Sequence, residues 1–176
     1  MTRLNMTHAT QQLAYLQWKR DQLAFVFHKE APNECSKGDS RFFVIGSVCH
    51  PWFGEIYPRF YHHGRKHIPD FLLDTLSPLS LAIWYQDDGT YNRNPMSRQA
   101  TLCSDAYPHK EVDAAADVLR SKFGLRVSVY KHHALGSFKT RKARYARICI
   151  LRASVPDFFD LVRPYIHPAM AYKVTA

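Results

Sequence analysis

The stretch Ser77–Gly89 constrains the fold of this chain more than any other part of its sequence. Ser77 is a typical helix N-cap, and Pro78 suits a first helical turn, where its missing N–H is not needed. All residues but one from Leu79 to Tyr85 are apolar. A helix that is apolar on all sides must be buried on all sides, and about ten residues are too few to span a membrane. We therefore expect a short core helix against which the rest of the chain packs.

The end of this helix carries two adjacent acids, Asp87 and Asp88, followed by Gly89 as a stop signal. A carboxylate there meets the negative end of the helix dipole at a cost of roughly 0.3–1 kcal/mol, and the two acids repel each other. A divalent cation bound by carboxylate oxygen would offset both effects. A solvated Asp-Asp-Gly turn is the alternative, because Asp-Gly turns are common. On the chemistry of these residues alone, both interpretations stay open.

The residues from Leu81 to Gly89 read Leu-Ala-Ile-Trp-Tyr-Gln-Asp-Asp-Gly and resemble the motif that names the LAGLIDADG homing endonucleases. The greatest similarity is to the branch with a second motif of the type L-A-x-W-x-x-D-D-G. Two flanking pieces also fit that branch: Lys66–Pro69 before the helix, and the run from Pro164 to Lys173 after it. The resemblance covers nearly the whole chain, and its motifs are specific in combination.

The charge of the chain favours a polyanionic partner. Lys and Arg number 24 against 15 Asp and Glu, and the isoelectric point is near 9.5. This balance is typical of nucleic-acid binding but does not identify a partner. No segment reads as a membrane span or a secretory signal, so no membrane partner is expected. The four cysteines form no paired metal motif, and we expect an intracellular, reduced protein, in the cytoplasm or, if intron-encoded, in an organelle.

Alternation and helical spacing predict strands and helices along the whole chain. Strands or hairpins are expected at 3–8, 41–49, 90–105, 125–130 and 145–151, and helices at 10–27, 51–61, 77–89, 108–123 and 156–165. Residues 31–40 are polar, contain Pro32 and Gly38, and are expected to form a loop or hairpin turn.

A similar order of elements occurs twice, which predicts an N-terminal half at 1–76 and a C-terminal half at 77–176. The fold expected is α+β, with two pseudo-twofold related half-domains that each consist of an antiparallel sheet backed by helices. The resemblance implies that the two sheets form a saddle over DNA. In two-repeat members of the family each half begins with its own motif helix, whereas no such helix or first strand is evident in the first half of this chain. Either the chain is a fragment, or a partner supplies the missing helix, or the protein has lost cleavage and kept binding.

The resemblance also implies a metal-dependent active site at the end of the motif helix. Asp88 is then the acid that ligates the metal, with Gly89 beside it, and Mg²⁺ is the ion expected. Lys66 and Lys173 match the active-site lysines of the family through their places in Lys-x-Ile-Pro and Tyr-Lys. Without the resemblance, two surface lysines on solvated turns are the simpler interpretation.

Polar and basic residues of the predicted strands and their loops form a candidate DNA-binding face. On a sheet face Arg reads guanine and Gln reads adenine in the major groove, while Lys and Arg on loops contact phosphates. The candidates in the second half are Arg93, Arg98, Gln99, Thr101, Ser104, Lys131, Lys139, Arg141, Arg144 and Arg147. Those in the first half are Arg3, Asn5, Lys37 and Arg41. Each residue taken alone is also compatible with a solvated surface.

The sequence thus predicts a homing-type endonuclease that hydrolyses phosphodiester bonds at a specific site in double-stranded DNA. The alternative is a non-catalytic nucleic-acid-binding protein, either an RNA maturase for intron splicing or a domesticated DNA- or RNA-binding subunit. The missing first motif favours this alternative, and a basic scaffold protein is a third hypothesis. One motif per chain also predicts pairing through the motif helix, in a homodimer or with a complementing chain.

Overall fold

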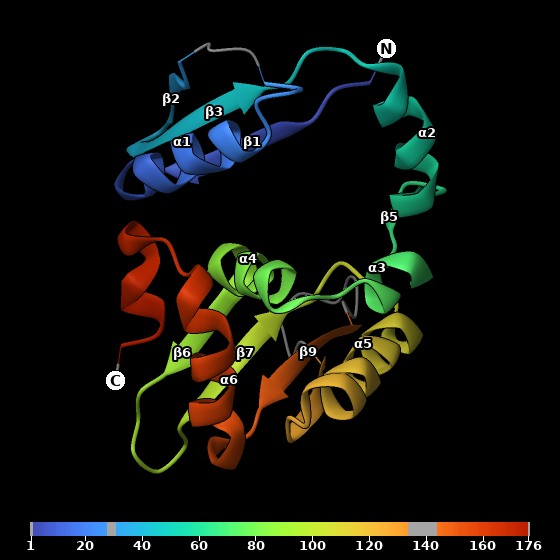
Figure 1. Ribbon diagram of the computed structural model, residues 1–176, viewed down its shortest axis with the longest axis vertical. Helices are drawn as coiled ribbons and strands as arrows, with labels where there is room; N and C mark the ends of the chain where they lie inside the picture. Colours follow the sequence, from blue (N-terminus) through green and yellow to red (C-terminus); the bar gives the residue numbers. More distant parts are fainter. Residues whose placement is uncertain (1, 28–30, 134–143, 176) are drawn as a thin grey trace. The chain divides into compact units, whose positions relative to one another are not determined.

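The computed structural model of the chain describes residues 2–27, 31–133 and 144–175. The chain divides into two compact units (Figure 1). Unit 1 comprises residues 1–59 and 167–172, and unit 2 comprises residues 60–166 and 173–176. The halves predicted at 1–76 and 77–176 follow the repeat of elements rather than contacts, and they stay a prediction about that repeat.

Unit 1 is a three-stranded antiparallel sheet with a helix packed on it. The strands lie in the order β1-β3-β2, with Met6 opposite Ile45 and Cys35 opposite Phe42. Its elements are β1 (Asn5–Ala9), η1 (Thr10–Gln12), α1 (Leu13–Gln22), β2 (Asn33–Lys37), β3 (Ser40–Gly46) and α2 (Pro51–Phe60), with most of η4 (Pro168–Lys173). The buried core consists of Leu16, Val26, Phe27, Ile45 and Phe53.

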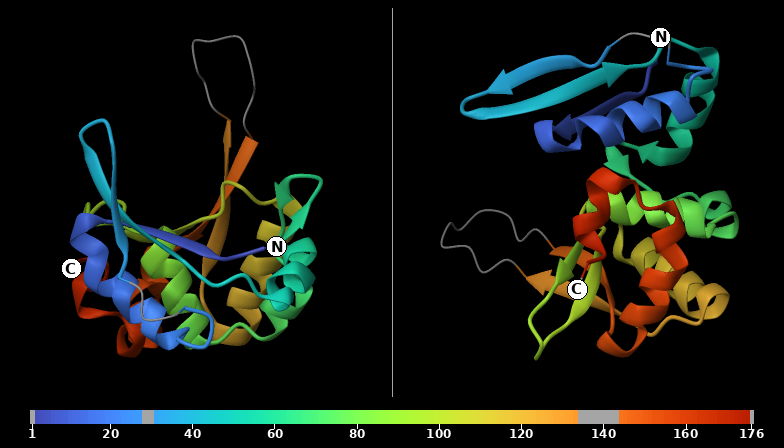
Figure 2. Two further views of the ribbon diagram at one scale, coloured as in Figure 1. Left: turned by 90° about the horizontal axis from the view of Figure 1, so that it is seen from above. Right: turned by 60° about the vertical axis from the view of Figure 1, so that its left-hand side comes forward.

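Unit 2 is built on a four-stranded antiparallel sheet in the order β6-β7-β9-β8. Its elements are β4 (Tyr61–His62), β5 (Arg65–Lys66), α3 (Asp70–Asp74), α4 (Pro78–Asp88), β6 (Gly89–Asn92), β7 (Gln99–Cys103), α5 (His109–Phe123), β8 (Val127–His133), β9 (Arg144–Ile150), η2 (Arg152–Ser154), α6 (Val155–Val162) and η3 (Arg163–Tyr165). The views in Figures 1 and 2 agree that α4, α5 and α6 lie on one side of this sheet. The other side carries no helix from the described part of unit 2.

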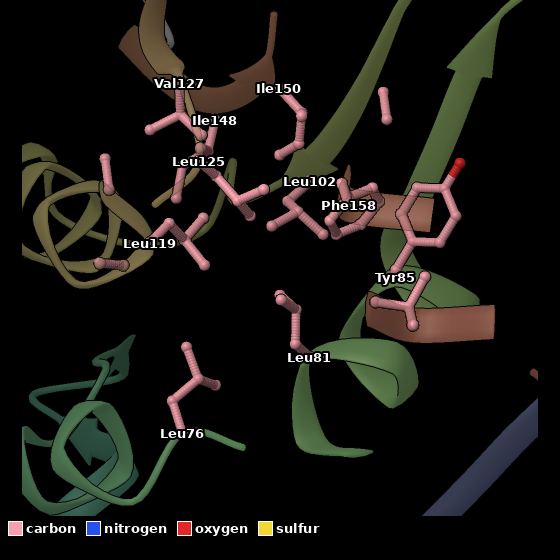
Figure 3. Packing of buried hydrophobic residues seen from close by; sticks show 14 of the residues in the cluster. Leu76, Leu81, Tyr85, Leu102, Leu119, Leu125, Val127, Ile148, Ile150 and Phe158 are labelled. Carbon is pink, nitrogen blue, oxygen red and sulfur yellow. The ribbon is translucent and has the colours of Figure 1, made fainter. Parts of the chain in front are cut away.

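The core of unit 2 lies between the sheet and these three helices. Figure 3 shows Leu81 and Tyr85 of α4 beside Leu102 of β7 and Phe158 of α6. The rings of Tyr85 and Phe158 meet edge to face, with centroids 5.0 Å apart. Burial of a side chain of this size contributes about 1.5–3 kcal/mol, so α4 is the core element that the sequence predicts. The expected burial on all sides is wrong on one side of α4: Leu79 is 43% exposed, and Ile83, one turn later, is half-buried.

Both ends of α4 follow from local sequence. Ser77 and Ser80 form a capping box: the Ser80 N–H donates to Ser77 Oγ at 3.2 Å, and the Ser77 N–H donates to Ser80 Oγ at 2.7 Å. The helix ends at Asp88, as predicted. Gly89 is not left-handed, however: its φ of −89° and ψ of 153° are extended, so the chain runs directly from α4 into β6.

Most other predicted elements are confirmed, and two need correction. The helix predicted over 10–27 is shorter, because the Val26 carbonyl accepts a hydrogen bond from the Val48 N–H and the chain turns after Gln22. The segment 31–40, expected to be a loop or hairpin turn, contains strand β2. Its polar sequence shows no alternation, and the strand forms because β3 supplies the hydrogen-bond ladder.

The two units share an order of elements, which supports the predicted α+β repeat. The series β1-α1-β2-β3-α2 of unit 1 matches β7-α5-β8-β9-α6 of unit 2, and the sheet order β1-β3-β2 matches β7-β9-β8. No helix or strand among the described residues of unit 1 corresponds to α4 and β6. The saddle depends on how the units are placed and stays a prediction. None of the described helices has the length and hydropathy needed to cross a membrane.

Candidate functional site

Asp88 lies at the C-terminal end of α4, where the chain passes into β6. Its side chain is exposed, and within the described residues its carboxylate makes no hydrogen bond or ion pair. Burial is the main cause of a raised pKa at both Tyr107 and Cys103, and the negative charge of Asp88 adds to both shifts. Asp88 is therefore an unpaired carboxylate close to these two side chains.

The ammonium group of Lys173 caps the same end of α4. Its Nζ donates to the carbonyl oxygens of Gln86 at 2.5 Å, Gly89 at 2.9 Å and Tyr85 at 3.4 Å. In return, the Tyr85 hydroxyl donates to the Lys173 carbonyl oxygen at 2.8 Å. Burial lowers the pKa of Lys173, and the two neighbouring aspartates oppose this shift. A cation on these carbonyls offsets the unfavourable position of two acids at the negative end of the helix.

Replacement of Lys173 by methionine is expected to lower the free energy of unfolding by about 1–3 kcal/mol, because the carbonyls at the end of α4 lose a charged donor. Lys122→Met is a matched control. Lys122 also donates to a carbonyl near a helix end, that of Asp74 at 2.9 Å, but through one exposed bond. Its loss is expected to change stability by less than about 0.5 kcal/mol. Urea denaturation of both variants measures the difference, and equal values would contradict the capping role.

Lys66 belongs to β5 and lies near the same site. Its Nζ is 5.7 Å from the centroid of the Tyr107 ring. The positive charge of Lys66 opposes the rise in the pKa of Tyr107, whereas Asp88 adds to it, so the phenol lies within the electrostatic reach of both groups. Tyr107 thus lies near Lys66 and is influenced by the charge of Asp88, a position that the sequence did not indicate.

A carboxylate on α5 holds the segment that follows Lys66. Glu111 Oε2 accepts a hydrogen bond from the Ile68 N–H at 2.7 Å, and Glu111 Oε1 lies 2.6 Å from His67 Nδ1. These two contacts fix the chain immediately after the lysine. The interaction joins residues more than 40 positions apart, and no local pattern in the sequence could have predicted it.

Gln86 is a buried polar residue to which the sequence assigned no role. Its side chain has no exposed surface, and its Nε2 donates to the carbonyl oxygens of Ala82 and Tyr165, both at 3.2 Å. These bonds tie the last turn of α4 to the segment after α6. Gln86 is therefore a structural support for the end of α4 that carries Asp88.

The donor set at this end of α4 suits a cation shared with a substrate. Mg²⁺ keeps several waters and is commonly bound by one or two carboxylates together with phosphate oxygens. Asp88 offers one exposed carboxylate without a protein partner in the described chain, whereas the Gly89 carbonyl already accepts from Lys173. No group of three or more His, Cys, Asp or Glu side chains among the described residues could form a complete metal cage. Asp88 therefore fits as a single ligand.

The helix-free side of the unit 2 sheet, here called the outer face, carries polar and aromatic side chains. Along β7 and β9 the buried residues Ala100, Leu102, Ala146 and Ile148 point to the helices, so their neighbours point outward. The outer face consists of Thr90, Asn92, Gln99, Thr101, Cys103, Ser128, Tyr130, Tyr145, Arg147 and Cys149.

The strand register connects Asp88 to this outer face. Cys103 lies opposite Arg147 on β9, and Arg147 lies opposite Tyr130 on β8. Because Gly89 is opposite Leu102, Asp88 is the residue next in line with Cys103. One row of the sheet thus runs from Cys103 through Arg147 to Tyr130, and Asp88, the last residue of α4, lies before the Cys103 end of this row.

Three of the predicted DNA-binding residues of the second half lie on the outer face: Gln99, Thr101 and Arg147. Ser104 does not, and its assignment as a contact is corrected. It is 1% exposed and donates to the Ala146 carbonyl oxygen at 2.7 Å, because one further step along the strand turns its side chain inward.

The other predicted contacts of the second half are distributed around the outer face rather than on it. Lys131 points toward the helices, with its Nζ 3.5 Å from Asp113 of α5. Arg93 donates to the Thr175 carbonyl oxygen at 3.2 Å, and Arg98 is exposed at the β6–β7 connection. Only the backbone of Arg144 is described, in β9, and Lys139 and Arg141 lie outside the described residues.

The predicted residues of the first half divide in the same way. Arg3 and Asn5 line a hollow of about 410 Å³ on the unit 1 sheet, together with Asn33 of β2. Lys37 is exposed at the β2–β3 connection. Arg41 lies 3.7 Å from Glu34, and both side chains are exposed. Arg3 and Asn5 are thus brought together, and the other two are not.

The sequence model of the LAGLIDADG DNA endonuclease family matches residues 1–158 of this chain. A Protein RecA of Mycolicibacterium chitae is 32% identical over 98% of the chain, which spans 40% of that protein. The Probable intron-encoded endonuclease 1 of Wickerhamomyces canadensis is 30% identical over 71% of the chain and 52% of its own length. The Cytochrome b mRNA maturase bI2 of Debaryomyces hansenii is 29% identical over 69% of the chain and 42% of its own length. The chain thus spans about half or less of the length of these relatives.

Solved structures share the fold. The homing endonuclease I-WcaI, bound to its DNA recognition sequence, aligns with a TM-score of 0.80 at 23% identity, over 98% of this chain and 75% of its own. The homing endonuclease I-DmoI, in a complex with its target DNA and manganese, aligns with a TM-score of 0.53 at 9% identity, over 95% of this chain and 82% of its own. At these identities the alignments concern the fold, and they agree with the mixed helix and antiparallel-sheet architecture described above.

Proposed function

This chain belongs to the LAGLIDADG DNA endonuclease family, and on that premise we propose that it is a homing-type endonuclease that hydrolyses double-stranded DNA with the help of Mg²⁺. The observation that carries the proposal is the end of α4. There a carboxylate without a protein partner in the described chain, Asp88, stands at one end of a row of the outer face, with Lys66 and Lys173 nearby. A protein that only binds nucleic acid through a basic surface does not need a carboxylate at this position.

Asp88 is the proposed metal ligand. A bound divalent cation would supply charge stabilisation to the phosphate and a hydroxide near neutral pH. Gly89 was predicted to lie beside the metal, but its carbonyl oxygen accepts a hydrogen bond from Lys173. Its proposed role is therefore to let the chain pass from α4 into β6 where no side chain fits. The exposed position of Asp88 leaves room for phosphate and water as the other ligands.

The two lysines have different proposed roles. Lys66 supplies positive charge beside Tyr107, where it would stabilise the charge that develops on the phosphate. Lys173 acts on the last turn of α4 and on Gly89 through its three carbonyl contacts, so it positions Asp88 and also screens it from Asp87. Glu111 supports Lys66 by holding the Ile68 N–H.

The outer face is the proposed DNA-binding surface of unit 2. Gln99, Thr101 and Arg147 present donors and acceptors suited to base edges, and the exposed basic residues around them are suited to phosphates. Arg3 and Asn5 at the hollow of unit 1 are the equivalent candidates there. A saddle formed by both sheets would give the protein one continuous surface for a duplex.

A second acid is proposed to come from outside the described residues. Unit 1 has no described counterpart of α4 and β6, and β1 pairs with a strand on one edge only, whereas its counterpart β7 pairs on both. A helix and strand from a further segment of the same polypeptide, from a second copy, or from another polypeptide would complete both features. The mass of the protein–DNA complex, measured by light scattering, shows whether a second copy is present.

A non-catalytic nucleic-acid-binding protein is the second candidate function, as an RNA maturase or a domesticated binding subunit. The observation that favours it is that the described chain has one motif helix and therefore one proposed metal ligand, Asp88. The similarity to a maturase agrees with this alternative. Both candidates use the same basic surface, so only the chemistry at Asp88 separates them.

The proposed activity is tested in two steps. A randomised DNA duplex library is first selected for binding in EDTA, and the selected duplex is then incubated with Mg²⁺. We expect cleavage at one position with Mg²⁺ and none with excess EDTA, because the reaction needs the divalent cation. Affinity in the first step should fall steeply with salt as counterions are released.

Two results would overturn the proposal in different ways. Selective binding without cleavage at any Mg²⁺ or Mn²⁺ concentration would reject the endonuclease and support the binding protein. No selective binding to any duplex, together with retention of structured RNA, would support the maturase.

A further inference from the structure

Arg147 is an arginine on the outer face of the unit 2 sheet. It lies on β9, which pairs with β7 on one side and β8 on the other, so it is central in the sheet. Its side chain is 36% exposed. A long side chain in this position can reach a ligand that lies across the strands, provided that some of its donors are free.

A carboxylate and an aromatic ring hold the guanidinium of Arg147 in place. Its Nε and Nη2 donate to Asp105 Oδ1 and Oδ2, both at 2.7 Å. The ring of Tyr145 lies on another side, with its centroid 4.9 Å from the guanidinium carbon. The hydrogen bonding of the guanidinium to the Asp105 carboxylate is the main cause of a raised pKa at Arg147. The side chain is therefore charged and oriented before any ligand arrives.

The free donors of this guanidinium form a defined pair. An arginine has five N–H groups, and Asp105 takes the one on Nε and one of the two on Nη2. The other Nη2 hydrogen and both Nη1 hydrogens have no acceptor among the described residues. Nη1 and Nη2 each keep one N–H bond that points away from Asp105, and these two N–H bonds are parallel.

This pair matches a guanine better than a phosphate. In the major groove guanine presents two acceptors, O6 and N7, whereas adenine replaces one of them with an N6 donor. A phosphate also offers two acceptors, but Asp105 neutralises much of the charge that would attract it. Bidentate geometry rather than net charge therefore sets the preference of this arginine.

We infer that Arg147, held by Asp105 and Tyr145, is a specificity-determining residue that reads one guanine in the major groove of the bound duplex. The inference rests on the proposed DNA-binding function and deepens it. It predicts that the recognition sequence contains one guanine whose recognition depends on Arg147 and its two supports.

The test is the selection from a randomised duplex library, performed in EDTA so that cleavage plays no part. The wild-type chain is compared with Arg147→Ala, Arg147→Lys and Asp105→Asn. We expect one position with a strong guanine preference in the wild type. That preference should fall by about 5- to 150-fold in Arg147→Ala and equally in Arg147→Lys, because lysine keeps the charge but lacks the paired donors. Asp105→Asn should weaken the same position to a smaller extent.

Arg163→Ala is the matched control, because Arg163 also pairs with an aspartate, Asp160 at 3.1 Å, but on the helical side of unit 2. It should leave every base preference unchanged. Circular dichroism melts establish that each variant is folded, and Arg147→Lys retains a long cationic side chain if the alanine variant is unstable.

The outcomes separate the inference from the proposed function. A selective wild type whose preferences stay the same in Arg147→Ala and Arg147→Lys, with only a uniform loss of affinity, would make Arg147 a phosphate contact and overturn the inference alone. A wild type without any base preference would overturn the proposed function as well.

Discussion

Replacement of Asp88 by asparagine is expected to slow DNA cleavage by at least about 100- to 1,000-fold, while Asp87→Asn should keep the rate within about tenfold of the wild type. Metal-assisted stabilisation of the transition state is worth several kcal/mol, and each 1.4 kcal/mol corresponds to a factor of ten. The two aspartates are adjacent in sequence, both are exposed, and each substitution removes one negative charge. The pair therefore separates a specific ligand role from a general effect of charge.

The structure distinguishes the two acids by their neighbours. Asp88 acts electrostatically on Tyr107 and Cys103, which lie toward Lys66 and the outer face. Asp87 acts on Lys173, and so does Asp88. Asp88 thus acts both on the lysine cap and on side chains of the proposed substrate side. Loss of Asp87 should mainly change the balance of charge at the end of α4.

The measurement is single-turnover cleavage of the selected duplex at saturating Mg²⁺, with affinity measured separately in EDTA. Both variants should bind DNA at least as tightly as the wild type, because each loses a negative charge near phosphate. Equal cleavage rates for Asp88→Asn and the wild type would remove Asp88 from the active site. Equal losses in both variants would indicate that charge at the helix end, rather than one ligand, controls the reaction.

The sequence predicted α4 well because the information is local. Ser77, Pro78 and Gly89 act within a few residues of the helix ends, and all residues but one from Leu79 to Tyr85 are apolar. The hairpin at 90–105 and helix α5 could be predicted from the sequence for the same reason. The family resemblance added the role of Asp88, which the chemistry of an Asp-Asp-Gly turn left open.

The residues that the sequence could not assign depend on contacts between distant segments. The hydrogen bonds from Lys173 to the last turn of α4 and to Gly89 join residues 84 to 88 positions apart. The hydrogen bonds of Glu111 to Ile68 and of Gln86 to Tyr165 also join residues that are distant in the sequence. Ser104 is different, because a strict alternation of strand residues from Leu102 onward would have placed it inside. The same alternation would have added Tyr130 and Tyr145 to the outer face.

Replacement of Gly89 by alanine is expected to lower the free energy of unfolding by about 3 kcal/mol, at the upper end of the range for overpacking. Its φ and ψ are allowed for any residue, so the cost is not backbone strain. A Cβ at this position would instead meet the ring and the carbonyl oxygen of Tyr85. Gly89 is thus required by a close approach between the start of β6 and the last turn of α4.

Tyr85 cannot move aside without further loss. It has no exposed surface, its ring packs edge to face on Phe158, and its hydroxyl donates to the Lys173 carbonyl oxygen at 2.8 Å. A shift of the ring would weaken this hydrogen bond and also the contacts of the Lys173 ammonium group at the same end of α4. The substitution should therefore also displace Asp88 and reduce cleavage, even at temperatures where the protein remains folded.

Gly54→Ala is the matched control for this prediction. Gly54 lies within α2, and a Cβ there would meet no atom within 4 Å. Alanine is favoured over glycine inside a helix by up to about 1 kcal/mol, so this variant should be neutral or slightly more stable. Urea denaturation, followed by far-ultraviolet circular dichroism, measures both changes. If the free energy of unfolding of Gly89→Ala lies within about 1 kcal/mol of the wild-type value, the Tyr85 ring and the Lys173 segment are looser than described, and the fixed position of Asp88 loses its structural basis.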